Sequence, residues 1–427
     1  MREKKYWNEK AETMPLEKLR RLQEEAFKEV VERAYDKTKF YRRMFNEAGV
    51  KPADIKTLDD IHQLPFTTDV EVASDISLGD RLAVPEEEIK MFHSTSGTVG
   101  AVVPIAFTSR DVDLFLNELE ARSRWSMGVR PWDIVQILTR FDCCLLGCRT
   151  LGASLVLLSA GRYNVDQQIH LTKTAGVTVI EQMPSLLLGY FQRMEELGIK
   201  VKETKLRMVD GVGEGWAESY KRKMEEKYGL PFMTLWGAVE MGGFAAAECE
   251  ARQGMHIFAD LGLLEVIDPD TGQPLPEGEE GELVVTTFFS EAVPLIRYRV
   301  GDIAKLLPYE PCPCGRTLPK IAYVKGRASQ IMRVNGKKVM PIDVEEIVAK
   351  TEGLSDQYQI VMEKPEVKRL KVRVEYSPEV KELEALKKKA EEAFFHDLGV
   401  ETEVALVPAG SIERTTFKAQ RIKRTYL

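Results

Sequence analysis

VTVIEQMPSLLLGYFQRMEELG, residues 177–198, gives the clearest indication of the fold class: an apolar, β-rich run is followed directly by apolar residues at helical spacing. The same alternation extends from about residue 90 to residue 240, where runs such as DIVQILT and SLVLLSA are separated by helical patterns. Strands separated by helices indicate crossover connections, which are typical of a parallel or mostly parallel sheet. The pattern therefore predicts an α/β fold.

The chain on either side of this region has a different texture. Residues 15–49 repeat apolar residues at helical spacing with charges on the opposite face, which predicts opening helices. After residue 255 the short runs LLEVID, PDTG and ELVVTTFF favour antiparallel strands joined by turns. The tail has a hairpin candidate at VNGKKV and further helical and strand patterns, enough for a small α+β domain. We expect a large N-terminal domain of mixed β-sheets and helices at 1–325 and a small α+β C-terminal domain at 326–427.

The charge balance bears on the class of partner. The 427 residues contain 60 Lys and Arg against 67 Asp and Glu, a net charge of −7, and the two signs are interspersed. A nucleic-acid partner normally requires a basic face, so the composition argues against one. The start, MREKKYWNEK, lacks an apolar signal region, and the longest apolar stretches, such as 151–161, are far shorter than the roughly 20 residues of a membrane span. We therefore expect a cytoplasmic protein with no membrane partner.

Residues 93–100, HSTSGTVG, gather hydroxyl and glycine residues just before the strand-like segment VVPIAF. Small residues let backbone N–H groups converge on an anion, and hydroxyls add donors, so the run is a candidate phosphate cradle. It lacks the Gly-Lys-Ser/Thr ending of the common nucleotide-binding loop, and a flexible Ser/Gly turn is the alternative. The candidate phosphate-binding residues are Ser94, Thr95, Ser96, Gly97, Thr98 and Gly100.

Further segments follow in a defined order: GEGW at 213–216, WGAVE at 236–240, YRVGD at 298–302, Gly326-Arg327 and a lysine near the C-terminus. Together they resemble the motifs of the adenylate-forming superfamily of acyl- and aryl-CoA ligases, luciferases and peptide-synthetase adenylation domains. The resemblance covers essentially the whole chain. It is closest to the phenylacetate–CoA ligase branch, on LPFTT at 64–68, EAVPLIRYRVGDIAKL at 291–306 and CPCGR at 312–316.

The resemblance implies an AMP-forming carboxylate–CoA ligase that works in two steps. A carboxylate attacks the α-phosphate of ATP to give an acyl-adenylate and pyrophosphate, and coenzyme A then displaces AMP. Glu240 matches the glutamate that binds Mg²⁺ with ATP, a hard oxygen ligand suited to that ion. Asp302 matches the acceptor of the ribose hydroxyls. The residues matched to the adenine and ribose site are Gly213, Glu214, Gly215, Trp236, Gly237, Asp302 and Arg327, with Trp236 at a stacking position more often held by Tyr.

Lys418, in ERTTFKAQR at 413–421, matches the lysine that enters the site for adenylation. An ammonium between the attacking carboxylate and the α-phosphate would orient both and offset developing charge. The alternative is a solvated lysine in a basic tail.

The small domain of the family swings about a hinge, which matches Ser329 and Gln330, and presents a CoA-facing surface near Asn335 and Gly336. Four positions depart from the family pattern. Ser329 replaces the usual Asp of the hinge, and the next residue, Gln330, is not acidic. Ala101 follows the phosphate loop where the family has Lys or Arg, and Val239 precedes Glu240 where the family has Thr. These departures bear on the rate and on the CoA half-reaction.

Cys249, His256, Cys312 and Cys314 supply three thiolates and an imidazole, a Cys₃His set suited to a closed, structural tetrahedral zinc site. The one-residue gap in Cys312-Pro313-Cys314 is tighter than usual, and four unrelated side chains are the alternative. The other cysteines, Cys143, Cys144 and Cys148, lie in an apolar segment and are expected to be core or pocket-wall residues.

The expected acyl pocket lies between the phosphate loop and the strand that carries Trp236, with Phe141, Ala238, Met241 and Gly242 as its candidate wall. An aryl or arylacetic acid is the substrate class that the resemblance implies, and a homodimer is left open. Two other functions also stay open: an adenylate-forming enzyme with a non-CoA acceptor (an amine, a carrier-protein thiol or a cofactor), and a nucleotide-binding regulator without turnover.

Overall fold

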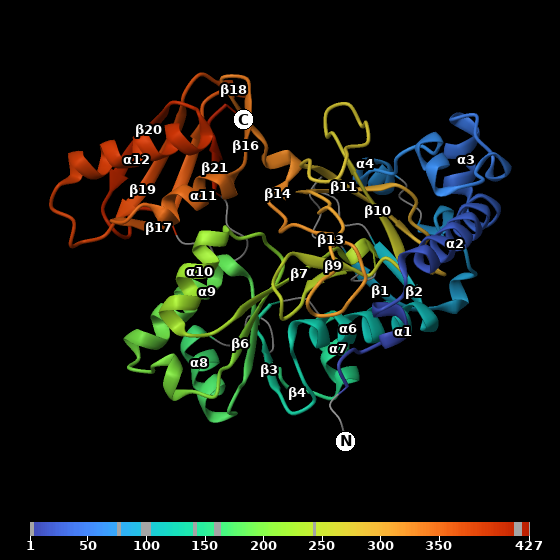
Figure 1. The fold of residues 1–427 in the computed structure, drawn as a ribbon, viewed down its shortest axis with the longest axis horizontal. Coiled ribbons are helices and arrows are strands. Elements are labelled where there is room, and N and C mark those ends of the chain that lie inside the picture. Colours follow the sequence, from blue (N-terminus) through green and yellow to red (C-terminus); the bar gives the residue numbers. More distant parts are fainter. Residues whose placement is uncertain are drawn as a thin grey trace. The chain divides into compact units, whose positions relative to one another are not determined.

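The computed structural model describes residues 4–74, 78–94, 104–139, 143–157, 164–241, 245–413 and 421–426. The chain forms two compact units, one of Met1–Leu155 with Thr234–Ala322 and one of Val156–Met233 with Tyr323–Leu427 (Figure 1). Among the described residues, no helix is both long enough and apolar enough to cross a membrane. The predicted domain boundary at residue 325 stays a prediction.

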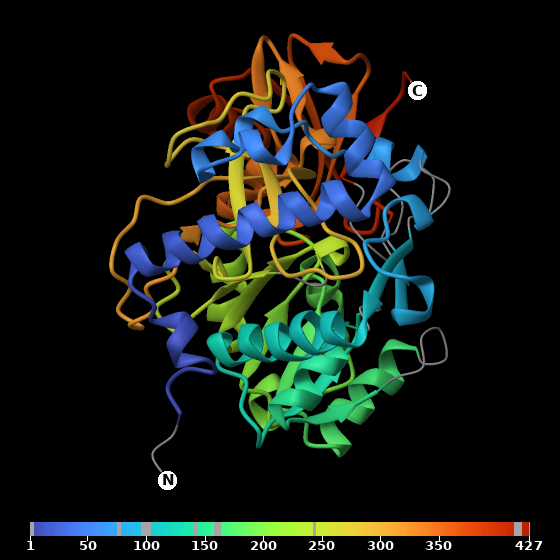
Figure 2. The same cartoon turned by 90° about the vertical axis from the view of Figure 1, so that its right-hand side faces the viewer.

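Near its start, the first unit has two longer helices, α2 (Leu16–Lys37) and α3 (Lys39–Glu47), as the sequence pattern predicts. Residues at helical spacing on α2, including Phe27 and Val31, are fully buried against the sheet region around Phe288 and Ile296. The helix α2 runs across strands β10 and β11, seen as the long blue helix in front of the yellow strands in Figure 2. Burying one apolar stripe of each helix is what stabilises both, because short helices are marginal on their own.

Two antiparallel arrangements of strands follow in this unit. Strands β10 (Gly262–Ile267), β11 (Gly281–Thr287) and β12 (Tyr298–Ala304) pair in that order. Strands β7 (Phe232–Gly237), β8 (Ala245–Glu248), β9 (Met255–Ile257) and β13 (Lys320–Ile321) also pair antiparallel. The other elements here are α1 (Glu9–Glu12), α4 (Asp69–Ser74), β1 (Ile89–Ser94), β2 (Pro104–Thr108), α5 (Ser109–Asp111), α6 (Glu120–Met127), β3 (Ile134–Ile137), α7 (Cys143–Leu151) and β4 (Ser154–Val156).

The second unit contains the stretch quoted first. Strand β5 (Val179–Gln182) leads into helix α9 (Pro184–Glu196) and pairs parallel with β6 (Met208–Gly211), so the predicted strand, helix and parallel pairing are confirmed. Helices α8 (Val165–Thr174) and α10 (Glu218–Tyr228) belong to the same segment. In the first unit, strands β1 and β2 pair antiparallel as a separate two-stranded sheet, a pairing that the alternation of strand and helix patterns does not predict.

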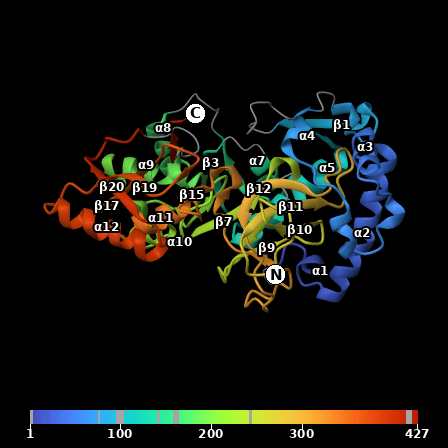
Figure 3. The ribbon, with the colours of Figure 1, turned by 90° about the horizontal axis from the view of Figure 1, so that it is seen from above.

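The C-terminal part of this unit has its own apolar core. Most of its buried residues come from helices α11 (Pro341–Lys350) and α12 (Leu383–Leu398) and strands β17 (Leu354–Met362), β19 (Leu370–Tyr376) and β20 (Thr402–Val407), which lie together in Figure 3. The predicted hairpin at VNGKKV is confirmed: Asn335 and Gly336 both have positive φ, at 49° and 78°, as a two-residue type I′ turn requires. The remaining strands are β14 (Gly326–Arg327), β15 (Met332–Val334), β16 (Lys337–Val339), β18 (Glu366–Val367) and β21 (Ile422–Arg424).

Candidate active site

Trp236 and Asp302, predicted as adenine- and ribose-binding residues, lie in direct contact although 66 residues separate them. Trp236 is near the end of β7 and only 6% exposed, and its indole Nε1–H donates to Asp302 Oδ2 at 2.8 Å. Asp302 lies in β12, directly after Gly301, whose φ of 83° is one that glycine adopts readily. The indole therefore holds the carboxylate in one orientation, a contact that sequence spacing does not predict.

Glu240, the predicted Mg²⁺ ligand, takes part in a second contact between the same two segments. Tyr298 Oη donates to Glu240 Oε1 at 3.2 Å, and the Tyr298 side chain is buried. Trp236 and Glu240 are four residues apart, and so are Tyr298 and Asp302. The two segments run antiparallel, because the first residue of each contacts the last residue of the other. The structure therefore pairs the two short segments that carry the predicted carboxylates. The sequence motif YRVGD contains Tyr298 but gives no sign of its contact with Glu240.

We predict that Asp302→Ala weakens ATP binding by about 10- to 100-fold, because it removes a charged hydrogen-bond acceptor. Trp236→Phe keeps an apolar ring but removes the N–H that orients Asp302, so a smaller loss of about fivefold is expected. Isothermal titration calorimetry with ATP measures both. Trp132→Phe is the matched control, since Trp132 is 66% exposed. Unchanged ATP affinity in Asp302→Ala would refute the ribose assignment.

The candidate phosphate loop connects β1 to β2, and the predicted strand after it is confirmed as β2. Ser94 ends β1 opposite Pro104 and is exposed; its neighbours Thr95, Ser96, Gly97, Thr98 and Gly100 lie outside the described residues. Asp111, fully buried after β2, accepts hydrogen bonds from the backbone N–H groups of Glu291 and Ala292 at 2.6 and 2.9 Å. The end of the hairpin is thereby tied to the chain segment that leads into β12.

The candidate acyl-pocket residues are only partly described. Met241 is 1% exposed and Ala238 is half-buried, both next to Glu240. Gly237, matched to the nucleotide site, is exposed. Phe141 and Gly242 lie outside the described residues, so their assignment to the pocket stays a prediction.

In the second unit, the GEGW segment follows β6 as predicted, and two of its residues have structural roles. Glu214 Oε2 accepts from the backbone N–H of Ser185 at 3.1 Å, which places a carboxylate at the positive N-terminal end of α9. A Cβ on Gly215 would lie 2.2 Å from the carbonyl oxygen of Val324, so only glycine fits there. Gly213 is exposed with φ of 82°. Their adenine-binding roles stay predictions.

The candidate hinge and CoA-facing residues are all in this second unit. Arg327 N–H donates to Gln330 Oε1 at 2.9 Å, and Arg424 donates to the backbone carbonyl of the exposed Ser329 at 2.8 Å. Asn335 and Gly336 form the exposed tip of the β15–β16 hairpin. The hinge, nucleotide and CoA roles of these residues stay predictions.

Lys418 lies outside the described residues, but Arg421, three residues later, makes defined contacts. The carbonyl oxygen of Arg421 accepts from Ile360 N–H at 2.7 Å as the chain enters β21, which pairs parallel with β17. The Arg421 guanidinium lies 4.4 Å from the Tyr358 ring centre. Nearby, burial raises the pKa of Glu345 to about 7, although the charge of Arg421 opposes the shift. The C-terminal end of the lysine segment is therefore anchored to the sheet of this unit.

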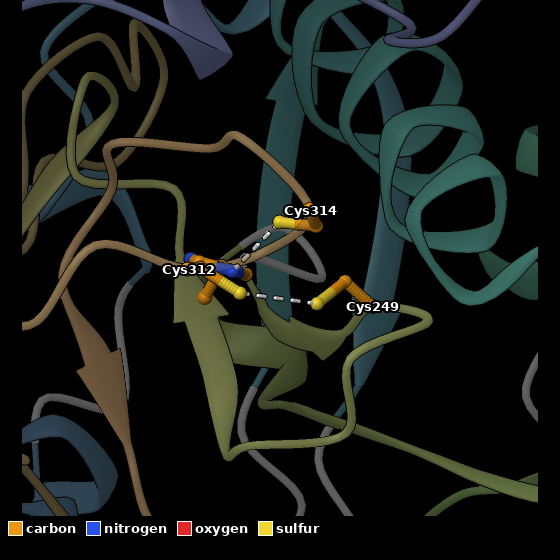
Figure 4. A group of neighbouring side chains, drawn as sticks. Cys249, Cys312 and Cys314 are labelled. Atoms are coloured by element: carbon orange, nitrogen blue, oxygen red, sulfur yellow. Dashed lines mark hydrogen bonds between the residues drawn. The ribbon is translucent and has the colours of Figure 1, made fainter.

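The four candidate zinc ligands are brought together and all are buried. Their ligand atoms lie within 4.8 Å of one another. Figure 4 shows the three cysteines of this group. Cys249 Sγ lies 3.7 Å from Cys312 Sγ, and Cys314 Sγ lies 3.4 Å from His256 Nε2. His256 Nδ1 lies 3.0 Å from the carbonyl oxygen of Leu318, so a proton on Nδ1 leaves Nε2 free as a ligand. The donor set and this outer contact both fit zinc.

The surroundings of Cys314 favour its thiolate. Its hydrogen bond with the Cys249 side chain, and to a smaller degree that with His256, holds the pKa of the Cys314 thiol well below its usual range.

The N-terminal segment contacts the same turn. Tyr6 Oη donates to the Cys314 carbonyl at 3.2 Å, and Arg316 Nε donates to the fully buried Glu12 at 2.7 Å. The N-terminal segment is therefore built into the cysteine turn, which sequence reasoning missed because no local pattern marks it. Cys148 is fully buried, as expected for a core residue.

The chain matches two family models and several known proteins. Residues 12–288 match the AMP-binding enzyme model and residues 336–424 the AMP-binding enzyme C-terminal domain. It is 34% identical to the phenylacetate-coenzyme A ligase of Thermus thermophilus, over 95% of this chain and 96% of that one. It is 30% identical to the Escherichia coli phenylacetate-coenzyme A ligase, over 96% of each.

Among solved structures, 2-hydroxyisobutyryl-CoA ligase, in a complex with an adenylate in its postadenylation state, matches with a TM-score of 0.90 and 25% identity, over 99% of this chain and 93% of that one. The predicted resemblance to the phenylacetate–CoA ligase branch and the predicted α/β fold are both confirmed. The chain belongs to the AMP-binding enzyme family.

Proposed function

We propose that this protein is an ATP-dependent, AMP-forming carboxylate–CoA ligase that acts through an acyl-adenylate. The observation that carries the proposal is the pair of contacts Trp236–Asp302 and Tyr298–Glu240, which joins the two segments that carry the carboxylates of the expected nucleotide site. The comparisons support this proposal, because the relatives that are similar over nearly the full chain are named phenylacetate-coenzyme A ligases. The similar solved structure is named 2-hydroxyisobutyryl-CoA ligase.

In this mechanism each described residue has a limited task. Asp302, oriented by Trp236, accepts the ribose hydroxyls of ATP as a charged acceptor. Glu240, oriented by Tyr298, is a hard oxygen ligand that fits Mg²⁺. The chemistry that Mg²⁺ would supply there, when bound with ATP, is neutralisation of the negative charge on the phosphates. Lys418 would orient the attacking carboxylate and the α-phosphate, and the thiol of CoA then displaces AMP from the acyl carbonyl.

We propose an aryl or arylacetic acid as the substrate class. The support is the name of the relatives at 30–34% identity, whereas the solved structure with the TM-score of 0.90 is named for a hydroxy acid. A panel of both acid types with ATP, Mg²⁺ and CoA, read by AMP and thioester formation, tests the class. AMP release without thioester would favour a non-CoA acceptor, and ATP binding without acid-dependent pyrophosphate release would favour a regulator. The cytoplasmic location and the homodimer stay predictions.

We further propose that Cys249, His256, Cys312 and Cys314 hold one structural zinc ion. The support is the closeness of the four buried ligand atoms and the contact of His256 with Leu318. With all four positions filled by protein, the ion would have no open position for substrate. Its role would be to join the turn after β8 to the CPCG turn, which are more than 60 residues apart.

A further inference from the structure

Arg297 has an unusual backbone conformation for its residue type. Its φ is 47°, in the left-handed region that arginine rarely adopts. It lies directly before Tyr298, the first residue of β12, whose hydroxyl contacts Glu240. Conformations of this kind persist only where the surroundings hold them, and they gather at functional sites.

The Arg297 side chain is held on every side. It is 4% exposed and forms a two-pronged ion pair with Glu265, with Nη2 to Oε1 at 2.9 Å and Nε to Oε2 at 3.2 Å. Its Nη1 donates to the carbonyl of Leu64 at 2.8 Å, and the guanidinium lies 4.0 Å from the ring centre of Phe66. A fork of this shape matches carboxylate geometry in a way that a lysine ammonium cannot.

The backbone around Arg297 is held equally firmly. Its N–H donates to Thr286 Oγ1 at 3.0 Å, and its carbonyl accepts from Thr67 N–H at 3.0 Å. Thr67, from the LPFTT segment, also donates its hydroxyl to the Ile296 carbonyl at 2.7 Å and accepts from Arg299 N–H at 2.9 Å. These contacts fix the direction in which the chain enters β12, and therefore the place of the Tyr298 hydroxyl.

We propose that Arg297 is a positioning residue for the metal–nucleotide site: its clamp on Glu265 and on residues 64–66 sets the left-handed turn that aims Tyr298 at Glu240. The inference rests on the proposed function, because it concerns the ion that Glu240 would hold with ATP. Partners that orient a metal-binding carboxylate typically change metal affinity by about 10- to 100-fold when removed.

The molecule contains a matched control for this arrangement. Arg122 is 2% exposed, forms a two-pronged pair with Asp260 at 2.9 and 2.9 Å, and has its guanidinium 4.3 Å from the Phe258 ring centre. It lies in helix α6, and its Nε is also 3.7 Å from Glu12 Oε1. Arg122→Lys and Arg297→Lys therefore make the same chemical change in equally buried pairs, and only the second pair leads to Tyr298.

The test measures binding of Mn²⁺, as a paramagnetic substitute for Mg²⁺, to the protein with a non-hydrolysable ATP analogue by electron paramagnetic resonance. Arg297→Lys and Tyr298→Phe should each raise the Kd for Mn²⁺ by about 10-fold, and Arg122→Lys should leave it unchanged. The variant that carries both substitutions should have a Kd for Mn²⁺ no higher than the higher of the two single-variant values, because both changes act through Glu240. Equal Mn²⁺ affinity in Arg297→Lys and wild type, or equal weakening in Arg122→Lys, would overturn the proposal.

Glu265→Gln keeps Arg297 but removes the charge of its partner, and serves if Arg297→Lys does not fold. It should raise the Kd for Mn²⁺ in the same direction, and an unchanged value would again overturn the proposal. The readout needs no turnover, so it separates this inference from the proposed function. If the wild-type protein binds Mn²⁺ and nucleotide but activates no acid, that result contradicts the proposed ligase function and leaves the inference about Arg297 standing.

Discussion

Lys418→Ala should lower the rate of acyl-adenylate formation by at least about 100-fold while leaving thioester formation from supplied acyl-adenylate largely intact. Removal of one positioned charge or donor from a transition state typically costs about 100- to 1,000-fold. The lysine is expected to act only on the first step, where negative charge builds on the α-phosphate as the carboxylate attacks. Acid-dependent pyrophosphate release and thioester formation from synthetic acyl-adenylate and CoA measure the two steps separately.

Lys423→Ala is the matched control, because Lys423 is an exposed lysine five residues further along the same basic segment, within β21. It should change neither half-reaction. If Lys418→Ala slowed both steps equally, or neither, the assigned role would be wrong. Because Arg421 is anchored to β17, loss of the Lys418 amine alone is not expected to alter the fold of this unit.

The largest effect on stability is expected at the cysteine cluster. Protein prepared without chelator should carry about one zinc per chain, as a closed four-ligand site requires. Cys312→Ser, or removal of the ion by chelator or acid, should lower the melting temperature by roughly 5–10 °C, since loss of a bound metal is among the more destabilising changes. Acid acts because the thiolates and the imidazole must stay deprotonated to bind zinc. Elemental analysis and thermal scans with and without chelator measure these effects.

Cys148→Ser provides the control for the loss of a buried thiol. Cys148 is fully buried in α7, outside the four-ligand cluster. The substitution should lower the melting temperature somewhat, but it should leave the zinc content and the response to chelator as in wild type. Protein without zinc, whose melting temperature is insensitive to chelator, would leave the four residues as ordinary buried side chains.

Local patterns predicted much of the secondary structure, because periodicity and turn chemistry act within a few residues. The helical spacing of residues 15–49 predicted α2 and α3, and VNGKKV predicted the β15–β16 hairpin, whose turn requires positive φ at Asn335 and Gly336. Strand partners were harder to predict. Whether β1 and β2 pair parallel or antiparallel depends on the path of the connection between them, and the alternation of apolar runs does not predict that path.

Residue type and order were enough to identify the family, the Cys₃His donor set and the candidate carboxylates Glu240 and Asp302. The groups that contact these carboxylates are visible only in the folded chain: Trp236 on Asp302, Tyr298 on Glu240, and the buried pair of Arg297 with Glu265 behind Tyr298. Tyr6 and Glu12 meet the CPCG turn about 300 residues away in the same manner. The physical reason is that a hydrogen bond or ion pair needs two groups within about 3 Å, and the folded chain brings them to that distance without leaving a periodic trace in the sequence.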